Sequence, residues 1–268
     1  MVKSIFDIEN RLDIQKEFNK IVMNLHNEEY TCLRDDGYYD SFIGMIDEDL
    51  FLTWKYRDTF LSVEEYLEHI GFPNYVLSGG YEISAEKFLY YLEFILNMAL
   101  LSEKKTESSM DPKVYAVLQN INIILEKMNY QSEIVNDDKV IIIKRNEDAD
   151  SIIRNIPESI KNVLLEYNDF RNEEDIETKK SLLKVLDLYI EKNKGKIKSL
   201  DAKLYDTIGT IVNKMGINHP IKDFPFTTLE ESDLLIWYNN CFLLMIHAIR
   251  SIDISKIKND RDNLINSN

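Results

Sequence analysis

Residues that make tight turns are rare in this chain, and this limits the folds open to it. Only 8 glycines and 5 prolines occur among 268 residues. An all-β chain needs many turns, and these two residue types supply most of them. The first 30 residues instead repeat apolar side chains at three- and four-residue steps, as one face of a helix does. The sequence therefore predicts a mainly α-helical protein.

One segment departs from the helical pattern. Two β-rich runs flank the turn sequence "NDD" in "QSEIVNDDKVIIIKRNED", which is typical of a β-hairpin. We expect this hairpin at about 131–145. A lone hairpin is marginally stable, so it must pack on a helix. The predicted fold class is a helical bundle with one β-hairpin, preceded by an acidic N-terminal region that is α or α+β. Within that region, 31–60 suits short strands and short helical turns equally.

Polar residues divide the chain at 102–112, a stretch with no apolar residue apart from Met110. We expect an acidic region over 1–102, a helical domain with the hairpin over 111–255, and a frayed polar tail over 256–268. Helix ends carry clear signals. Ser62 with Glu65 forms a capping box, Ser84 and Ser199 are further N-caps, and Pro157 interrupts a helix.

The negative charge of the chain is uneven. The net charge is −15, and residues 1–100 hold 8 basic against 19 acidic side chains, while residues 101–268 hold 24 against 28. This field repels nucleic-acid phosphates and attracts basic proteins, although plain solubility explains it equally simply. If it serves binding, we expect a basic protein partner and the binding residues Asp35, Asp36, Asp40, Asp47 and Asp49.

The two cysteines, Cys32 and Cys241, lie far apart and suggest neither a disulfide framework nor a metal site. Reduced thiols fit the cytosol. No uninterrupted apolar run approaches ~18 residues, and the N-terminus lacks the apolar core of a signal peptide. We therefore expect a cytoplasmic protein that does not cross a membrane.

The sequence lacks the motifs of several common classes of enzyme. It contains no phosphate-binding GxxxxGK[ST] or GxGxxG loop, no GxSxG and no HExxH, and its four histidines are scattered. We expect no cofactor and no metal. One candidate for a Mg²⁺-dependent nuclease site is an acidic cluster that is followed by Lys55. The cluster consists of Asp35, Asp36, Asp40, Asp47, Glu48 and Asp49. A solvated acidic loop is the preferred interpretation.

A second candidate site lies in "NKMGINHPIKDFPF", between two predicted helices. His219 follows a helix C-terminus, which favours its protonated form. Asn218 is a polar neighbour, and Lys214 stands five residues before the histidine. A structural turn is the preferred interpretation of this segment, with catalysis as the alternative.

Residues 155–255 resemble a known group in the segments "LLEYNDFRNEEDIETKKSLLKVLDLYIE" and "DTIGTIVNKMGINHP … TLEESDLLIWYNNCFLLMIHAI". They are similar to the C-terminal helical domain of uncharacterised proteins from Firmicutes and their phages, and to the HEPN-type domains associated with abortive infection. The resemblance implies a helical domain that often pairs as a homodimer. It also implies an arginine beside the histidine and another four to six residues before it, the second to bind phosphate. This chain has Asn218 and Lys214 there, and lysine lacks the bidentate fork.

Taken together, these features predict a non-enzymatic, intracellular interaction protein in bacterial or phage conflict. It would be either a subunit of a phage-defence system or an acidic inhibitor of a basic partner. The alternative is a HEPN-like or metal-dependent nuclease with a degenerate site, using His219 with Lys214 or the acidic cluster.

Overall fold

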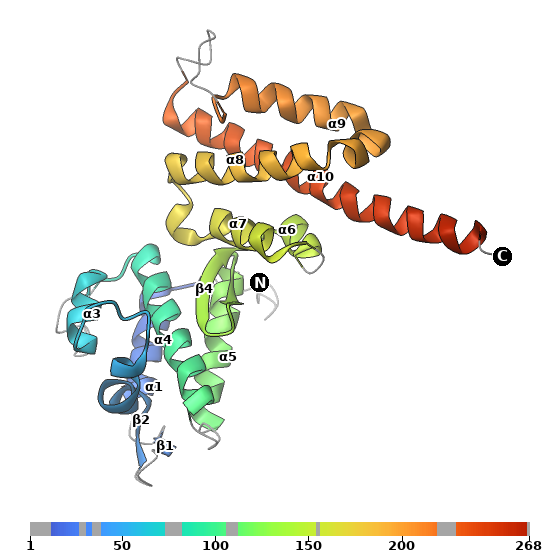
Figure 1. Cartoon of the computed structure of the whole chain (residues 1–268). Coiled ribbons are helices and arrows are strands. Elements are labelled where there is room, and N and C mark those ends of the chain that lie inside the picture. The colour runs from blue at the N-terminus through green and yellow to red at the C-terminus, as the bar shows by residue number, and fades with distance from the viewer. Residues whose placement is uncertain are drawn as a thin grey trace, which may run out of the picture. The chain divides into compact units, whose positions relative to one another are not determined.

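The computed structural model describes residues 12–26, 31–33, 39–72, 82–105, 112–153, 156–218 and 229–266. Its contacts divide the chain into two compact units. Unit 1 comprises residues 1–143, and unit 2 comprises residues 144–268. Both units are mainly helical, and the hairpin predicted for 131–145 is present (Figure 1). The predicted fold class, a helical bundle with one such hairpin, is confirmed.

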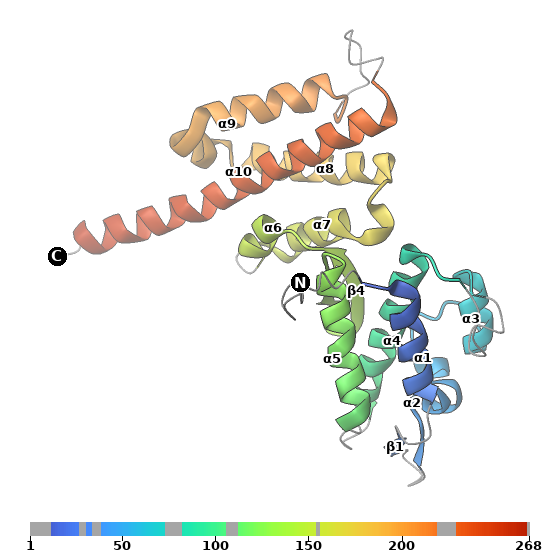
Figure 2. The ribbon, with the colours of Figure 1, turned by 180° about the vertical axis from the view of Figure 1, so that it is seen from behind.

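Unit 1 combines helices with two short strand pairs. Its helices are α1 (Ile14–His26), α2 (Phe42–Met45), α3 (Val63–His69), α4 (Ala85–Lys105) and α5 (Pro112–Lys127). Strands β1 (Thr31–Leu33) and β2 (Tyr39–Ser41) pair antiparallel. A π-helical turn, η1 (Ile46–Leu50), and a 3-10 turn, η2 (Phe51–Thr53), follow α2. The segment 31–60 thus contains both strands and helical turns. Helix α1 packs on α4 and α5 (Figure 2).

Aromatic side chains fill the core of unit 1. Phe88, Tyr91 and Phe94 are buried on α4, so these three aromatic side chains serve packing. Phe18 of α1 meets Tyr91 edge to face at 5.2 Å between ring centroids. Such aromatic pairs add to the stability that burial alone provides. Burial also raises the pKa of the Tyr91 hydroxyl.

The helix ends of unit 1 follow the local sequence. The Ser62 hydroxyl accepts from the Glu65 amide at 3.2 Å, as in the predicted capping box. The return bond is displaced by one residue, because the Glu65 carboxylate accepts from the amide of Leu61, at 3.0 Å, and not from that of Ser62. Ser84 caps α4 through the Lys87 amide. Helix α3 ends at His69, and Gly71, two residues later, adopts a φ of +88° that is easy only for glycine.

The hairpin joins β3 (Tyr130–Val135) to β4 (Lys139–Lys144) through a tight turn. Asn136 and Asp137 both adopt positive φ, at 53° and 62°. Two consecutive positive φ values define a type I′ turn, whose twist matches the twist of paired strands. The "NDD" sequence therefore forms the hairpin that it predicts, and β3 packs on α5.

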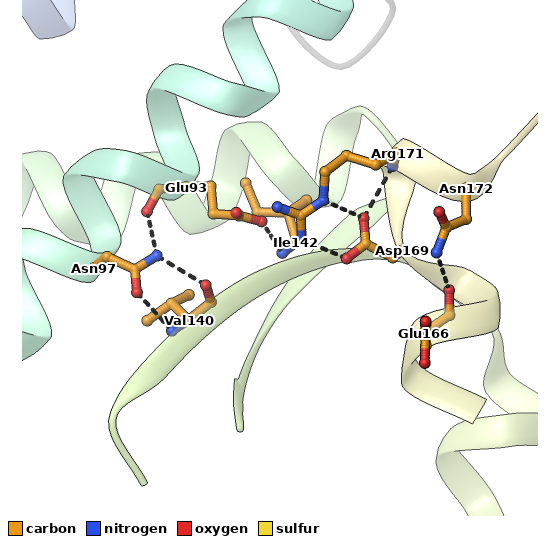
Figure 3. Close-up of polar contacts among 8 residues, drawn as sticks. All are labelled: Glu93, Asn97, Val140, Ile142, Glu166, Asp169, Arg171 and Asn172. Carbon is orange, nitrogen blue, oxygen red and sulfur yellow. Dashed lines mark hydrogen bonds and ion pairs between the residues drawn. The ribbon is translucent and has the colours of Figure 1, made fainter. Parts of the chain in front are cut away.

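Two polar residues of α4 bind the backbone of β4 (Figure 3). The Asn97 amide donates to the Val140 carbonyl at 2.8 Å and accepts from the Val140 amide at 2.9 Å. The Glu93 carboxylate accepts from the Ile142 amide at 2.9 Å. Asn97 and Glu93 are 3% and 8% exposed, so these bonds satisfy backbone groups that lie out of reach of water.

These contacts explain why the hairpin is grouped with the first unit. The polar stretch 102–112 predicts a domain boundary there, with the hairpin in the second domain, whereas the contacts divide the chain between Ile143 and Lys144. A polar linker marks where local composition changes. The bonds from Asn97 to Val140 span 43 residues, and no local pattern reports them.

Unit 2 is built from helices. They are α6 (Glu147–Ile152), α7 (Glu158–Asn168), α8 (Ile176–Lys192), α9 (Lys194–Lys214) and α10 (Glu231–Asn266), with a 3-10 turn, η4 (Phe170–Asn172). Helix α10 packs on α8 and α9, as Figure 1 shows. The shared core includes Leu183, Leu186, Ile208, Met245 and Ile246, each at most 1% exposed.

Local signals in unit 2 account for several helix ends and miss others. Pro157 precedes α7 and separates it from α6, as predicted. Asp175 caps α8 through the Thr178 amide at 2.9 Å. Ser199 is predicted to be an N-cap, but its hydroxyl donates back to the Lys196 carbonyl instead of accepting from a backbone amide. Instead Asp201, with non-helical backbone angles, accepts from the Leu204 amide at 2.8 Å.

The last helix is longer than expected. Residues 256–268 are predicted as a frayed tail, but α10 continues to Asn266. Within the described part of the chain, no helix is long and apolar enough to cross a membrane. The α10 thiol of Cys241 is fully buried, and burial raises its pKa to about 12.

Candidate functional site

The acidic residues singled out in the sequence lie in unit 1, and the structure describes some of them. Asp47 and Asp49 lie on η1, where Ile46 and Leu50 are buried at its two ends. Asp47 is exposed and Asp49 is half-buried. Asp40 belongs to β2, while Asp35 and Asp36 lie outside the described residues. The structure therefore anchors one part of the cluster, Asp47 to Asp49, on a turn held by buried apolar residues.

The second sequence candidate is the turn after α9. Lys214 is the exposed last residue of α9. The Asn218 amide donates to the Asp187 carboxylate of α8 at 2.7 Å. Asp187 is 6% exposed, and burial raises its pKa. His219 lies outside the described residues. Asn218 thus ties the start of this turn to the core of unit 2.

No metal centre is found among the side chains that the structure describes. No group of three or more His, Cys, Asp or Glu residues is arranged there to hold an ion. Lys55, which follows the acidic cluster in sequence, instead pairs with Asp138 of the hairpin turn. The Tyr56 hydroxyl donates to the same carboxylate at 2.8 Å. Hydrogen bonds from Lys55 and Tyr56 lower the pKa of Asp138.

A cavity that the sequence does not predict lies within unit 2. It has a volume of about 350 Å³ and is lined by residues of α7, α8 and α10 and of the segment 144–146. Lys179 of α8 lies in its wall, only 4% exposed. Buried lysines are rare because removing an ammonium from water is costly. A lysine in this buried position therefore needs an explanation.

Aromatic rings and two oxygens surround the Lys179 ammonium. Its Nζ lies 4.0 Å from the centroid of the Tyr167 ring, which stacks on Phe242 at 3.8 Å between ring centroids. Nζ donates to the Tyr167 carbonyl at 3.3 Å and to Asn239 Oδ1 at 3.4 Å. Both bonds are long for a charged donor. Burial lowers the pKa of Lys179 to about 8, partly opposed by the charge of Glu173.

Two acidic residues of the cavity wall are already paired. The Asp169 carboxylate accepts from the Arg171 amide at 2.9 Å and from its guanidinium Nε at 2.8 Å (Figure 3). Glu173 forms an ion pair with Lys144. Both acids thus have a cation of their own. Among the described residues, no carboxylate forms an ion pair with Lys179.

One sequence signal points to Lys179. Leu183, Leu186 and Ile190 follow it at four-, seven- and eleven-residue steps, and all three are buried. Lys179 therefore occupies the buried stripe of α8, where the pattern expects an apolar residue. The sequence alone does not single out this residue, because lysine is ordinarily exposed.

Comparison with known proteins leaves the chain without an assigned relative. No family model, no curated protein and no solved structure matches it.

Proposed function

We propose that this chain is a non-enzymatic interaction protein of bacterial or phage conflict and that its acidic first unit binds a basic protein. The distribution of charge supports this most. Residues 1–143 hold 13 Lys and Arg against 26 Asp and Glu, whereas residues 144–268 hold 19 against 21. A field concentrated on one compact unit attracts a basic surface and speeds its association.

Several carboxylates in the described part of unit 1 are exposed on helical turns. Asp47 and Glu48 are exposed on η1, and Glu64, Glu65 and Glu68 are exposed on α3. Charges held on helical turns bind a partner with less loss of conformational entropy than charges on a free loop. This supports a defence-system subunit or an inhibitor, located in the cytoplasm as the widely spaced cysteines suggest.

Neutralising the acidic cluster should weaken capture of a basic partner. We expect the loss to be about tenfold or more, because several complementary charges act together. The bait is the purified full chain, immobilised and exposed to host lysate at low and high salt, with mass spectrometry of what remains bound. The variant carries Asp35→Asn, Asp36→Asn, Asp40→Asn, Asp47→Asn and Asp49→Asn.

A control with the same net charge separates site from general charge. It carries five substitutions at exposed residues of unit 2, namely Glu166→Gln, Glu177→Gln, Glu230→Gln, Glu231→Gln and Asp233→Asn. At low salt, one basic protein should bind the control as it binds the wild type. High salt should release that protein from the wild type. Equal loss from both variants, or recovery of RNA in place of protein, would contradict the proposal.

A second candidate function is a degenerate HEPN-like ribonuclease in unit 2. The bond from Asn218 to buried Asp187 favours it, because a turn tied to a helical core holds its neighbours in place. The resemblance of residues 155–255 to HEPN-type domains also supports a homodimer that forms through unit 2.

We expect the ribonuclease alternative to fail when it is tested directly. Lys214 cannot bind a phosphate through two hydrogen bonds as the guanidinium group of an arginine does. The purified chain should therefore leave a labelled RNA intact at any protein concentration. His219→Ala should therefore change nothing. Cleavage that disappears in His219→Ala, yet persists when exposed His247 of α10 is changed to alanine, would support the ribonuclease instead.

A further inference from the structure

The cavity beside Lys179 has the size of a small-molecule site. Its volume of about 350 Å³ lies within the range of natural ligand pockets, roughly 300–1,000 Å³. Phe242 and Leu243 supply apolar surface, and Lys179, Asn239 and Arg145 supply polar atoms. A pocket with an apolar wall and a few converging polar groups is the usual form of a ligand site.

The hydrogen-bond acceptors of this cavity are largely occupied. Asn239 Oδ1 accepts from the Tyr167 hydroxyl at 3.0 Å as well as from Lys179. Arg171 binds Asp169, and Lys144 binds Glu173. A ligand that needed acceptors, such as an amine, would have to compete for these groups, and the carboxylate left to it is Glu174, which is exposed to water.

Donors, in contrast, remain available. The Lys179 ammonium makes two long bonds, to Tyr167 and Asn239, and has no carboxylate partner in the described part of the chain. The Asn239 side-chain NH₂ makes no hydrogen bond to any described residue, while its oxygen is held by two donors. An under-compensated buried cation beside an amide donor is the arrangement that recognises an oxyanion.

We propose that this cavity binds a small organic or inorganic oxyanion, a carboxylate or a phosphate, which pairs with Lys179 and accepts from the Asn239 amide. The lysine then gains a direct anionic partner, which no described residue provides. Three carboxylates of the wall oppose such a ligand: Asp169 and Glu173 are paired with cations, and Glu174 is exposed to solvent, which screens its charge. This site is separate from the acidic surface proposed for protein binding, and either proposal can fail without the other.

The test titrates the full chain with inorganic phosphate and with succinate at low ionic strength and neutral pH. Calorimetry gives the affinity and stoichiometry, and NMR follows the side-chain NH₂ of Asn239. We expect one of the two anions to bind saturably at one site and to shift those amide protons. The anion that binds identifies the class of ligand. If neither shows saturable binding, the proposal is overturned.

Three variants locate the site, with a fourth as control. Lys179→Met should weaken binding about tenfold or more, whereas Lys184→Met removes an equal charge from an exposed position of the same helix and should not. Equal weakening by both would overturn the proposal.

Asn239→Asp is the sharper variant, because it differs from asparagine by one functional group. Its carboxylate gives Lys179 a partner inside the chain and removes the amide donor, so binding should disappear while the fold persists. Glu174→Gln should strengthen binding. Undiminished anion binding by folded Asn239→Asp would overturn the proposal even if Lys179→Met failed to fold.

Discussion

Asn97→Leu should destabilise unit 1 by about 3 kcal/mol, the cost of leaving a buried backbone N–H and C=O without partners. Both groups belong to Val140, and Asn97 is their partner at 2.9 and 2.8 Å. Leucine favours the helix at least as well as asparagine, so helix propensity does not produce the loss. Urea unfolding measures it, with Trp54 fluorescence in a Trp237→Phe background reporting unit 1.

Two comparisons make this prediction specific. Asn122→Leu makes the same change at an exposed position of α5 and should cost much less. Hydrogen exchange of the Val140 amide should accelerate more than that of Ile142, because Glu93 still binds the latter. Unchanged exchange at Val140 would show that Asn97 does not hold the strand.

Lys179 should make the stability of unit 2 rise with pH in mildly alkaline solution. Its pKa is about 8 in the folded protein, against 10.5 ordinarily. The folded state therefore releases this proton before the unfolded state does, and stability increases as pH rises through 8 towards 10.5. At 1.36 kcal/mol per pKa unit, the full gain is ~3 kcal/mol, of which about 2 kcal/mol is reached by pH ~9.5.

The experiment compares wild type with Lys179→Met. Urea unfolding followed by Trp237, in a Trp54→Phe background, gives the stability of unit 2 at each pH. Methionine should be the more stable variant at pH ~7, because it removes a buried charge, and its advantage should shrink as pH rises. The raised pKa values of Cys241 and Tyr238 act in the opposite direction at higher pH, but they cancel in the difference between the two proteins. A difference that does not change with pH would contradict the prediction.

Features set by neighbouring residues were accessible from the sequence. The "NDD" turn requires positive φ at Asn136 and Asp137, and asparagine and aspartate tolerate it better than most residues. Ser62 and Ser84 cap their helices because a hydroxyl needs only the amide three residues ahead. In each case the cause and the effect lie within a few residues, so the pattern is sufficient.

Features set by distant residues were not accessible. Asn97 reads as one polar residue on an apolar helix, and its partner lies 43 residues away. Lys179 reads as an exposed lysine, although α10 covers it through Asn239, 60 residues later. Ser199 and Asp201 are both good N-caps, and the choice between them depends on where α9 bends. Tertiary packing decides all three.

The α4–β4 bonds also bear on how unit 1 behaves at high concentration. The second side of β4, away from β3, would otherwise present a row of free amides and carbonyls next to the apolar run Val140–Ile143. Such an edge is a template on which a strand of another molecule can add, and it is a common start of aggregation. The side chains of Asn97 and Glu93 bind the amides of that edge, so a further strand cannot pair with them. Variants at these two positions are accordingly the ones in which self-association is expected to begin.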